Sequence, residues 1–351
     1  MASRLRPSRS SILGLLVLLA FAVLAWTMRG RIHFDWHALG RQLRLISPWY
    51  LLAGLVVIYS GYWLRALRWA ILVGPVRRTT ARELLGCQLI GFTALVLVGR
   101  IADLVRPYLI ARRLRVSIAS QLAVYSLERA FDLGAAAALF SFTLAVAPRD
   151  IPHHAAYVRA GALSLTATLG IALFALALRS FGDRVAALAQ RLLQPISETF
   201  AQSASERLLD FRDGLRSITT LREFLTVSAL SLIMWAEIAI TYLLTARSFV
   251  GDPVLAHFTF TATMLMLATS LGGSLVQLPV VGWFTQIGLL SAAFVAFFGV
   301  SVETATACSA MLLCVLSVSV VPAGLIAARL EGTSLRNVMR QSHAVNEATE
   351  A

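Results

Sequence analysis

The chain has 351 residues, of which 58% are hydrophobic and 14% are charged, and its mean hydropathy is +0.75. These values exclude an ordinary soluble domain and are typical of an integral membrane protein. The formal net charge of +13 is carried by arginine, with no lysine in the sequence. It does not indicate a nucleic-acid-binding protein, because the arginines flank apolar segments instead of gathering on a soluble face with interleaved aromatic residues.

Six apolar segments are long enough to cross a membrane as helices, which takes about 20 residues. They lie near residues 11–27, 49–74, 119–147, 158–178, 224–246 and 303–328. The first of them resembles a secretory signal, but no clear small-x-small cleavage site follows it. We therefore expect it to be a retained first helix.

Two further apolar regions, 84–110 and 257–300, are interrupted by glycine, proline and polar residues. The arginine-rich segments are best placed in the cytoplasm, together with both chain ends, as the positive-inside rule requires. Each interrupted region must then enter and leave the membrane at one face, as a re-entrant helical hairpin, and the two enter from opposite faces. This pattern is typical of an inverted-repeat transporter with a polar cavity near the midplane.

Three segments are expected to lie outside the membrane core. Residues 28–47 are amphipathic and suit the membrane surface. Residues 179–222 combine helically spaced Leu and Ile with charged residues, which predicts a cytoplasmic amphipathic linker between the halves. The segment 330–351 is expected to be a flexible tail. The prediction is thus a single all-α transmembrane domain over 1–351, a polytopic bundle in the cytoplasmic membrane.

Ionisable residues inside apolar segments are candidates for a functional site, because each costs at least about 2.5–3.5 kcal/mol on insertion scales. In the first interrupted region, Arg100, Asp103 and Arg106 follow at i, i+3 and i+6 and are expected to share a helical face. Pro107 disfavours the α conformation at the residue before it, so we expect the helix to break there.

The third predicted span carries a second group of charges. Glu128 and Asp132 are one turn apart on one face, Arg129 lies beside them, and Glu128 is expected near the midplane. The C-terminal half supplies a secondary polar group, formed by Glu237, Gln277, Pro279, Gly282, Thr285 and Gln286.

Two interpretations of these charges remain open. In one, the acids and arginines only neutralise each other and hold helices together. In the other, the arginines bind an anionic ligand, for which the planar and permanently charged guanidinium is well suited. Arg65 and Arg68, near the cytoplasmic end of their span, are interpreted as snorkelling anchors.

The sequence around these charges resembles the flippase-like transmembrane domain of lysylphosphatidylglycerol synthases, from about residue 45 to 330. That family has an R-x-G-E-x-x-R-P-x-L-L element, followed about twenty residues later by E-R-x-x-D. The matching residues are Arg106, Pro107 and Leu109, then Glu128, Arg129 and Asp132.

The chain departs from the family pattern at two places. Ala102 and Asp103 replace a Gly-Glu pair, and a P-G-G-x-G-x-x-E pattern is reduced to Pro279, Gly282 and Gln286, without the final acid. The aminoacyltransferase domain of the full synthases is absent, so we do not expect this chain to make aminoacyl lipids.

The resemblance and the charges together predict a lipid translocase rather than an enzyme, with no metal and no cofactor. The expected partner is a membrane lipid with an anionic head group, a phospholipid or a polyprenyl-phosphate-type lipid. The expected head-group site is Arg100, Asp103, Arg106, Glu128, Arg129 and Asp132. The alternatives are an accessory subunit of a separate lipid-modifying enzyme and, third, a membrane-embedded lipid transferase.

Overall fold

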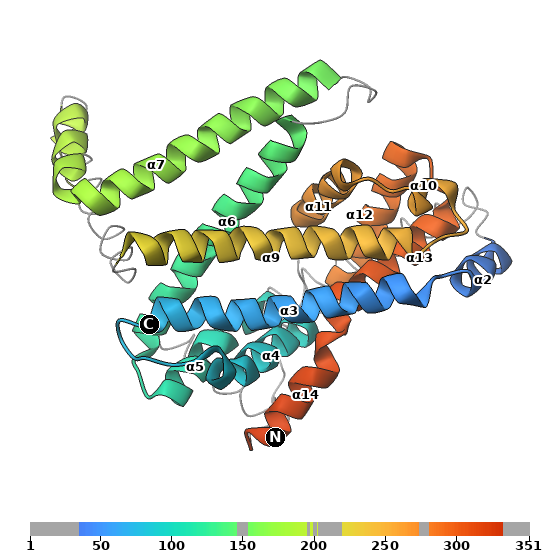
Figure 1. Cartoon of the computed structure of the whole chain (residues 1–351), viewed down its shortest axis with the longest axis horizontal. Helices are drawn as coiled ribbons and strands as arrows, with labels where there is room; N and C mark the ends of the chain where they lie inside the picture. The colour runs from blue at the N-terminus through green and yellow to red at the C-terminus, as the bar shows by residue number, and fades with distance from the viewer. Residues whose placement is uncertain are drawn as a thin grey trace, which may run out of the picture. The chain divides into compact units, whose positions relative to one another are not determined.

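The computed structural model describes residues 35–145, 154–194, 197, 198, 202, 220–273 and 281–332. These residues form helices and connecting turns, without a strand, which confirms the expected all-α fold. The helices labelled in Figure 1, with the two short helical segments η1 and η2, are α2 (Trp36–Arg44), α3 (Pro48–Val73), α4 (Ala81–Val98), η1 (Arg100–Leu104), α5 (Val105–Leu114), α6 (Ile118–Ala145), α7 (His154–Leu193), α9 (Leu221–Arg247), α10 (Pro253–Ala256), α11 (Phe260–Gly273), α12 (Val281–Phe298), α13 (Val302–Leu313), η2 (Cys314–Val318) and α14 (Val320–Leu330).

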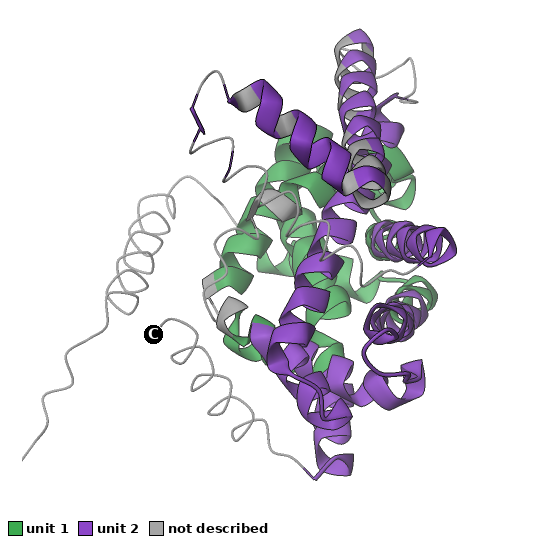
Figure 2. Cartoon of the chain, turned by 90° about the vertical axis from the view of Figure 1, so that its left-hand side faces the viewer, with its two compact units in different colours: residues 1–55, 93–103, 241–321 green, residues 56–92, 104–240, 322–351 purple. Residues whose placement is uncertain are grey.

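The chain divides into two compact units, coloured separately in Figure 2. Unit 1 comprises residues 1–55, 93–103 and 241–321, and unit 2 comprises residues 56–92, 104–240 and 322–351. The boundaries fall inside α3, α4, η1, α9 and α14, so both units are assembled from segments that are distant in the sequence.

Four helical segments of the described residues are long and apolar enough to cross a membrane, and they are Pro48–Val73, Ala81–Val98, Leu221–Arg247 and Val302–Leu330. Three of them match the spans expected near 49–74, 224–246 and 303–328. The residues of the expected spans 119–147 and 158–178 are helical, in α6 and in part of α7, but neither helix is among these four segments. The expected span 11–27 lies outside the described residues, as does most of the tail 330–351.

Helix α7 extends well past its expected end at residue 178. It continues to Leu193, with a kink at Phe181, where φ is −132° and ψ is 31°. The first third of the expected linker 179–222 is therefore a continuation of α7, and most of the remainder lies outside the described residues.

The first interrupted region consists of α4, η1 and α5. Helix α4 ends at Val98, and the chain turns at Gly99, whose φ of 83° is accessible to glycine at little cost. The prediction that Pro107 breaks the helix is wrong. Pro107 is the third residue of α5. Backbone N–H groups in the first turn of a helix have no acceptor within the helix, so a proline, which lacks the N–H, is tolerated there.

The second interrupted region consists of α11 and α12, both in unit 1. Each is a short apolar helix, and the segment that joins them, 274–280, lies outside the described residues together with Gln277 and Pro279. Each interrupted region thus has two helical arms among the described residues, but α4 in the first region is itself long and apolar enough to cross a membrane, unlike the expected re-entrant arm.

Helix α2 has the amphipathic character expected for part of 28–47. Asp35 caps it by accepting hydrogen bonds from the backbone N–H groups of His37 and Ala38, at 2.8 and 3.0 Å. No residue of α2 is buried, and Trp36 is 74% exposed. Such a helix suits a membrane surface. Residues 28–34 lie outside the described part of the chain.

Candidate functional site: a buried ion cluster in unit 2

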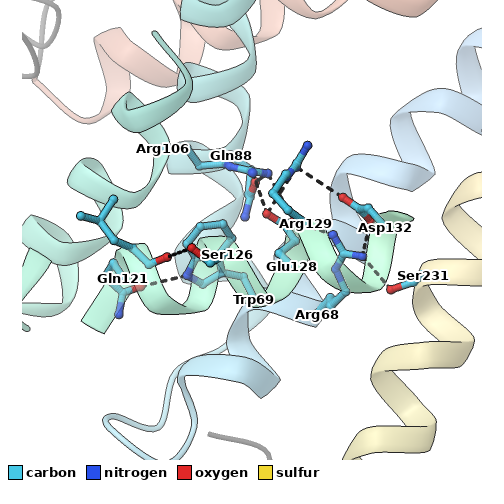
Figure 3. A network of polar contacts seen from close by, with 11 residues as sticks. Arg68, Trp69, Gln88, Arg106, Gln121, Ser126, Glu128, Arg129, Asp132 and Ser231 are labelled. Carbon is cyan, nitrogen blue, oxygen red and sulfur yellow. Dashed lines mark hydrogen bonds and ion pairs between the residues drawn. The ribbon is translucent and has the colours of Figure 1, made fainter. Parts of the chain in front are cut away.

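Glu128, in the middle of α6, is the centre of a buried ion cluster (Figure 3). Its side chain is 1% exposed, and each of its oxygens accepts a 2.6 Å charge-assisted hydrogen bond. Arg68 Nη2 of α3 donates to Oε1, and Arg106 Nη2 of α5 donates to Oε2. A buried carboxylate is stable only when it is paired in this way. Three helices of unit 2 are therefore held together at one acid.

Arg68 has two further partners in the same unit. Its Nη1 donates to Asp132 Oδ1 at 2.6 Å and to Ser231 Oγ of α9 at 2.7 Å, and the side chain is 1% exposed. The interpretation of Arg68 as a snorkelling anchor is therefore wrong. Its guanidinium is directed into the protein, where it connects α3 to both acids of the E-R-x-x-D element.

Arg106 lies in a pocket of aromatic rings. Its guanidinium carbon is 4.9 Å from the centroids of Trp69 and Phe92 and 5.5 Å from that of Tyr125. Each ring face stabilises the cation further. Gly91 of α4 makes this approach feasible, because a Cβ at that position would lie 2.7 Å from the Cβ of Arg106.

Polar side chains complete the surroundings of these rings. Gln88 Oε1 accepts from Arg106 Nη1 at 3.3 Å, and Gln121 Oε1 accepts from the indole N–H of Trp69 at 2.9 Å (Figure 3). Both glutamines are fully buried. Buried polar groups that bond in this manner fix the orientation of the groups around them.

Arg129 is the accessible cation of the cluster, with 44% of its side chain exposed. Its Nη2 lies 3.3 Å from Asp132 Oδ2 and 3.6 Å from Glu128 Oε2, longer than the 2.6 Å pairs of the other arginines. The guanidinium also stacks on Tyr125, at 5.2 Å. Arg68, Arg106 and Arg129 thus share two carboxylates, and the cluster carries an excess positive charge.

Arg100 and Asp103 do not continue the regular helix of Arg106. Both belong to the 3-10 turn η1, whereas Arg106 is the second residue of α5. The expected single helical face is therefore interrupted. Asp103 is half-buried and makes no hydrogen bond or ion pair with another described residue, and the Arg100 side chain lies outside what the structure describes.

The expected secondary group is distributed over both units. Glu237 of α9 belongs to unit 2, where its Oε1 accepts from Ser60 Oγ at 2.8 Å. Gly282 and Gln286 belong to α12 in unit 1. There, Ser270 Oγ lies 2.8 Å from the hydroxyl of Tyr242 and 3.3 Å from Gln286 Nε2, so Gln286 takes part in a neutral network between helices.

The helices and the cluster define the class of protein, an integral membrane domain with ion pairs buried among its helices. The particular family follows from comparison with family models. The model of the lysylphosphatidylglycerol synthase TM region matches residues 11–325, and the chain belongs to this family. Searches of the curated proteins and of the solved structures give no match.

Proposed function

We propose that this protein is a lipid translocase, which moves an anionic phospholipid or a polyprenyl-phosphate-type lipid between the leaflets of the cytoplasmic membrane. Its membrane fold and its family membership support a role in lipid biology in general. The proposal goes further, to transport and to an anionic head group.

The observation that carries the proposal is the charge of the cluster. Three guanidinium groups face two carboxylates, and Arg129, the cation with the longest ion pairs, is also the exposed one. Uncompensated charge within a membrane protein is costly unless an opposite charge arrives. A phosphate group supplies that charge, and arginine binds it in a bidentate manner.

The residues of the cluster have different roles in this proposal. Arg68, Arg106 and Glu128 bind one another and are positioning residues, because both Nη atoms of Arg68 and both oxygens of Glu128 are already hydrogen-bonded within the protein. Arg129 contacts the head group. Asp132 orients Arg129, which is also its neighbour at i+3 on α6. Transport then requires the site to become accessible from each leaflet in turn, as in carriers with broken helices.

Movement of a labelled lipid in reconstituted vesicles tests the proposal. Vesicles with the full chain and a fluorescent phosphatidylglycerol are treated with a membrane-impermeant quencher, which reports the fraction in the outer leaflet. We expect Arg129→Gln and Glu128→Gln to slow lipid movement at least about tenfold, because a single charge-assisted hydrogen bond contributes about 1.5–3 kcal/mol. Arg82→Gln, at an exposed arginine of α4, is the matched control.

Two results would contradict the proposal. Wild-type rates in both cluster variants would refute the assignment of the site. Absence of lipid movement in the wild-type vesicles, together with activity of a lipid-modifying enzyme that appears only on co-expression, would identify an accessory subunit. The neutral network of Gln286 in unit 1, where the family pattern has an acid, favours that second candidate.

A further inference from the structure

An open groove of about 580 Å³ lies on the N-terminal half of α9, within unit 2. Its volume is in the range of sites that bind small molecules. One row of its lining consists of residues that recur every fourth position and therefore share a helix face, namely Leu221, Leu225, Ala229 and Ile233. The small side chain of Ala229 leaves space between the larger Leu225 and Ile233, both of which are exposed. The groove is thus a hollow in an apolar surface.

The groove is separate from the buried ion cluster. Ser231, the α9 residue that accepts a hydrogen bond from Arg68, is fully buried. Ala229 and Ile233 are each two residues from Ser231, and two residues correspond to a rotation of about 200° around an α-helix. This row therefore faces away from the cluster. Because α9 is long and apolar enough to cross a membrane, an exposed apolar row on it contacts lipid chains.

The length of the groove corresponds to one leaflet of a bilayer. From Leu221 to Ile233 the row extends about 18 Å along the helix axis, at the rise of about 1.5 Å per residue of an α-helix. The apolar core of a bilayer is about 30 Å thick, so one leaflet supplies about 15 Å. A single acyl chain of a phospholipid therefore fits along the row from the membrane surface to the midplane.

Arg222 supplies a charge at the N-terminal end of the groove. It lines the groove as the second residue of α9, it is exposed, and it makes no ion pair with another described residue. The nearest acid in the sequence, Glu223, does not line the groove, and its carboxylate accepts from the backbone N–H of Thr220 at 3.1 Å. A guanidinium at the start of a membrane-spanning helix is well placed for the phosphate of a lipid whose chain lies in the groove.

We propose that this groove is a binding site for an anionic phospholipid, with one acyl chain along Leu225, Ala229 and Ile233 and the phosphate at Arg222. The site goes beyond the proposed function, because it lies on the opposite side of α9 from the cluster and does not depend on transport. A zwitterionic phospholipid has the same chains and the same phosphate, but it also carries a cation. The net negative charge of the head group is therefore what Arg222 selects.

Photocrosslinking of the full chain in detergent micelles tests the proposal. The probe is a phosphatidylglycerol with a photoreactive group in the middle of one acyl chain, and the labelled peptide is identified by mass spectrometry. We expect labelling within residues 221–233. Dioleoyl phosphatidylglycerol should displace the probe at least about fivefold more effectively than dioleoyl phosphatidylcholine, which is the factor expected for one basic side chain beside an anionic lipid.

Two variants separate the contributions of the charge and of the groove. Arg222→Gln should remove most of the preference for phosphatidylglycerol, and Ala229→Phe should fill the groove and reduce labelling at least about fivefold. Arg82→Gln is the control for the first, since Arg82 is the exposed second residue of α4 and has the same T-x-R-E sequence context as Arg222. Ala292→Phe, at an exposed position of α12, is the control for the second. Both controls should behave as the wild type.

Three results would overturn the proposal. Equal displacement of the probe by the two lipids in the wild type would contradict a site for an anionic head group. Unchanged labelling in Ala229→Phe, or labelling spread equally over α9 and α12, would show an ordinary lipid-facing surface. None of these results depends on lipid movement in vesicles, so failure of the proposed function is distinguishable from failure of this site.

Discussion

At the scale of single residues, Arg68 is the cation on which most of the buried cluster depends. It donates to Glu128, Asp132 and Ser231, all at 2.6–2.7 Å. Arg68→Met leaves two carboxylates short of a partner inside the protein. Breaking a buried ion pair from one side costs about 3–5 kcal/mol. We therefore expect a large decrease in the free energy of unfolding, measured by denaturant titration in detergent.

Arg82→Met provides the comparison for this substitution. Arg82 is exposed on α4, and exposed ion pairs contribute about 0–1 kcal/mol. The free energy of unfolding of this variant should stay close to that of the wild type. Equal losses in both variants would show that the hydrogen bonds of Arg68 do not stabilise the fold.

Gly61→Ala probes the space between Arg65 and Glu237. The new Cβ would lie 2.9 Å from Arg65 Nη1 and from Glu237 Oε2, so both side chains must shift. We expect a modestly lower melting temperature without loss of the fold, because both groups are ends of long side chains and can move. An unchanged melting temperature would show that Arg65 and Glu237 do not lie against Gly61.

At the scale of helices, the close approach of α4 and α5 depends on Gly91. A Cβ there would lie 2.7 Å from the Cβ of Arg106 and 3.1 Å from its Cα. Backbone and Cβ atoms cannot rotate away, so Gly91→Ala must separate the two helices. Overpacking of this kind costs about 1–3 kcal/mol. The expected result is a lower melting temperature.

Gly134→Ala is the matched control, because Gly134 lies within α6 and a Cβ there meets nothing within 4 Å. Alanine stabilises a helix interior by about 0.5–1 kcal/mol relative to glycine. Both substitutions replace glycine by alanine, but Gly91→Ala should lower the melting temperature and Gly134→Ala should raise it. The same sign for both would contradict the close approach of α4 and α5.

Glu331, directly after α14, makes a contact whose strength depends on pH. Its carboxylate lies against Gly86 of α4 and 4.0 Å from Arg113 of α5. Burial raises the pKa of Glu331 above its ordinary value of 4.5, and the charge of Arg113 opposes this increase. A carboxyl whose pKa is raised by folding binds more protons in the folded state than in the unfolded state.

The contribution of Glu331 to folding stability decreases as the pH rises. As the pH rises from 4.5 through the raised pKa of Glu331, its contribution to folding stability falls. Glu331→Gln removes this titration, so the melting temperature of the variant should decrease less than that of the wild type over the same range. Parallel curves for the two proteins would contradict the burial of the charged carboxylate.

At the scale of the whole molecule, hydropathy and arginine placement predicted the all-α membrane fold, and two short motifs predicted the core of the cluster. Arg106 and Glu128 are indeed bonded, at 2.6 Å. The partner that sequence reasoning missed is Arg68. Periodicity assigns a residue to a face of its helix, but it does not say what packs against that face. The available signal was the position of Arg68 itself, an ionisable residue inside the predicted span 49–74.

The position of the helix break was missed for a different physical reason. Pro107 restricts the backbone strongly, but at the start of α5 its restriction agrees with a helix. Gly99 does not force the backbone into any one conformation, and it only permits the positive φ that the turn adopts. A glycine that only permits a turn is a weaker sequence signal than a proline that restricts the backbone. Helix breaks at glycine are therefore recognised mainly from the tertiary structure.

The cluster described above is built on arginine alone among the cations, and this limits how the proposed transport could be driven. A guanidinium does not release its proton at any physiological pH, whereas a lysine in such surroundings readily does. A proton gradient therefore cannot switch the cationic half of the site on or off. In the proposed transport, the force on a bound anion would therefore not come from titration of these cations, and the membrane potential would contribute about 2.3 kcal/mol per elementary charge for each 100 mV crossed.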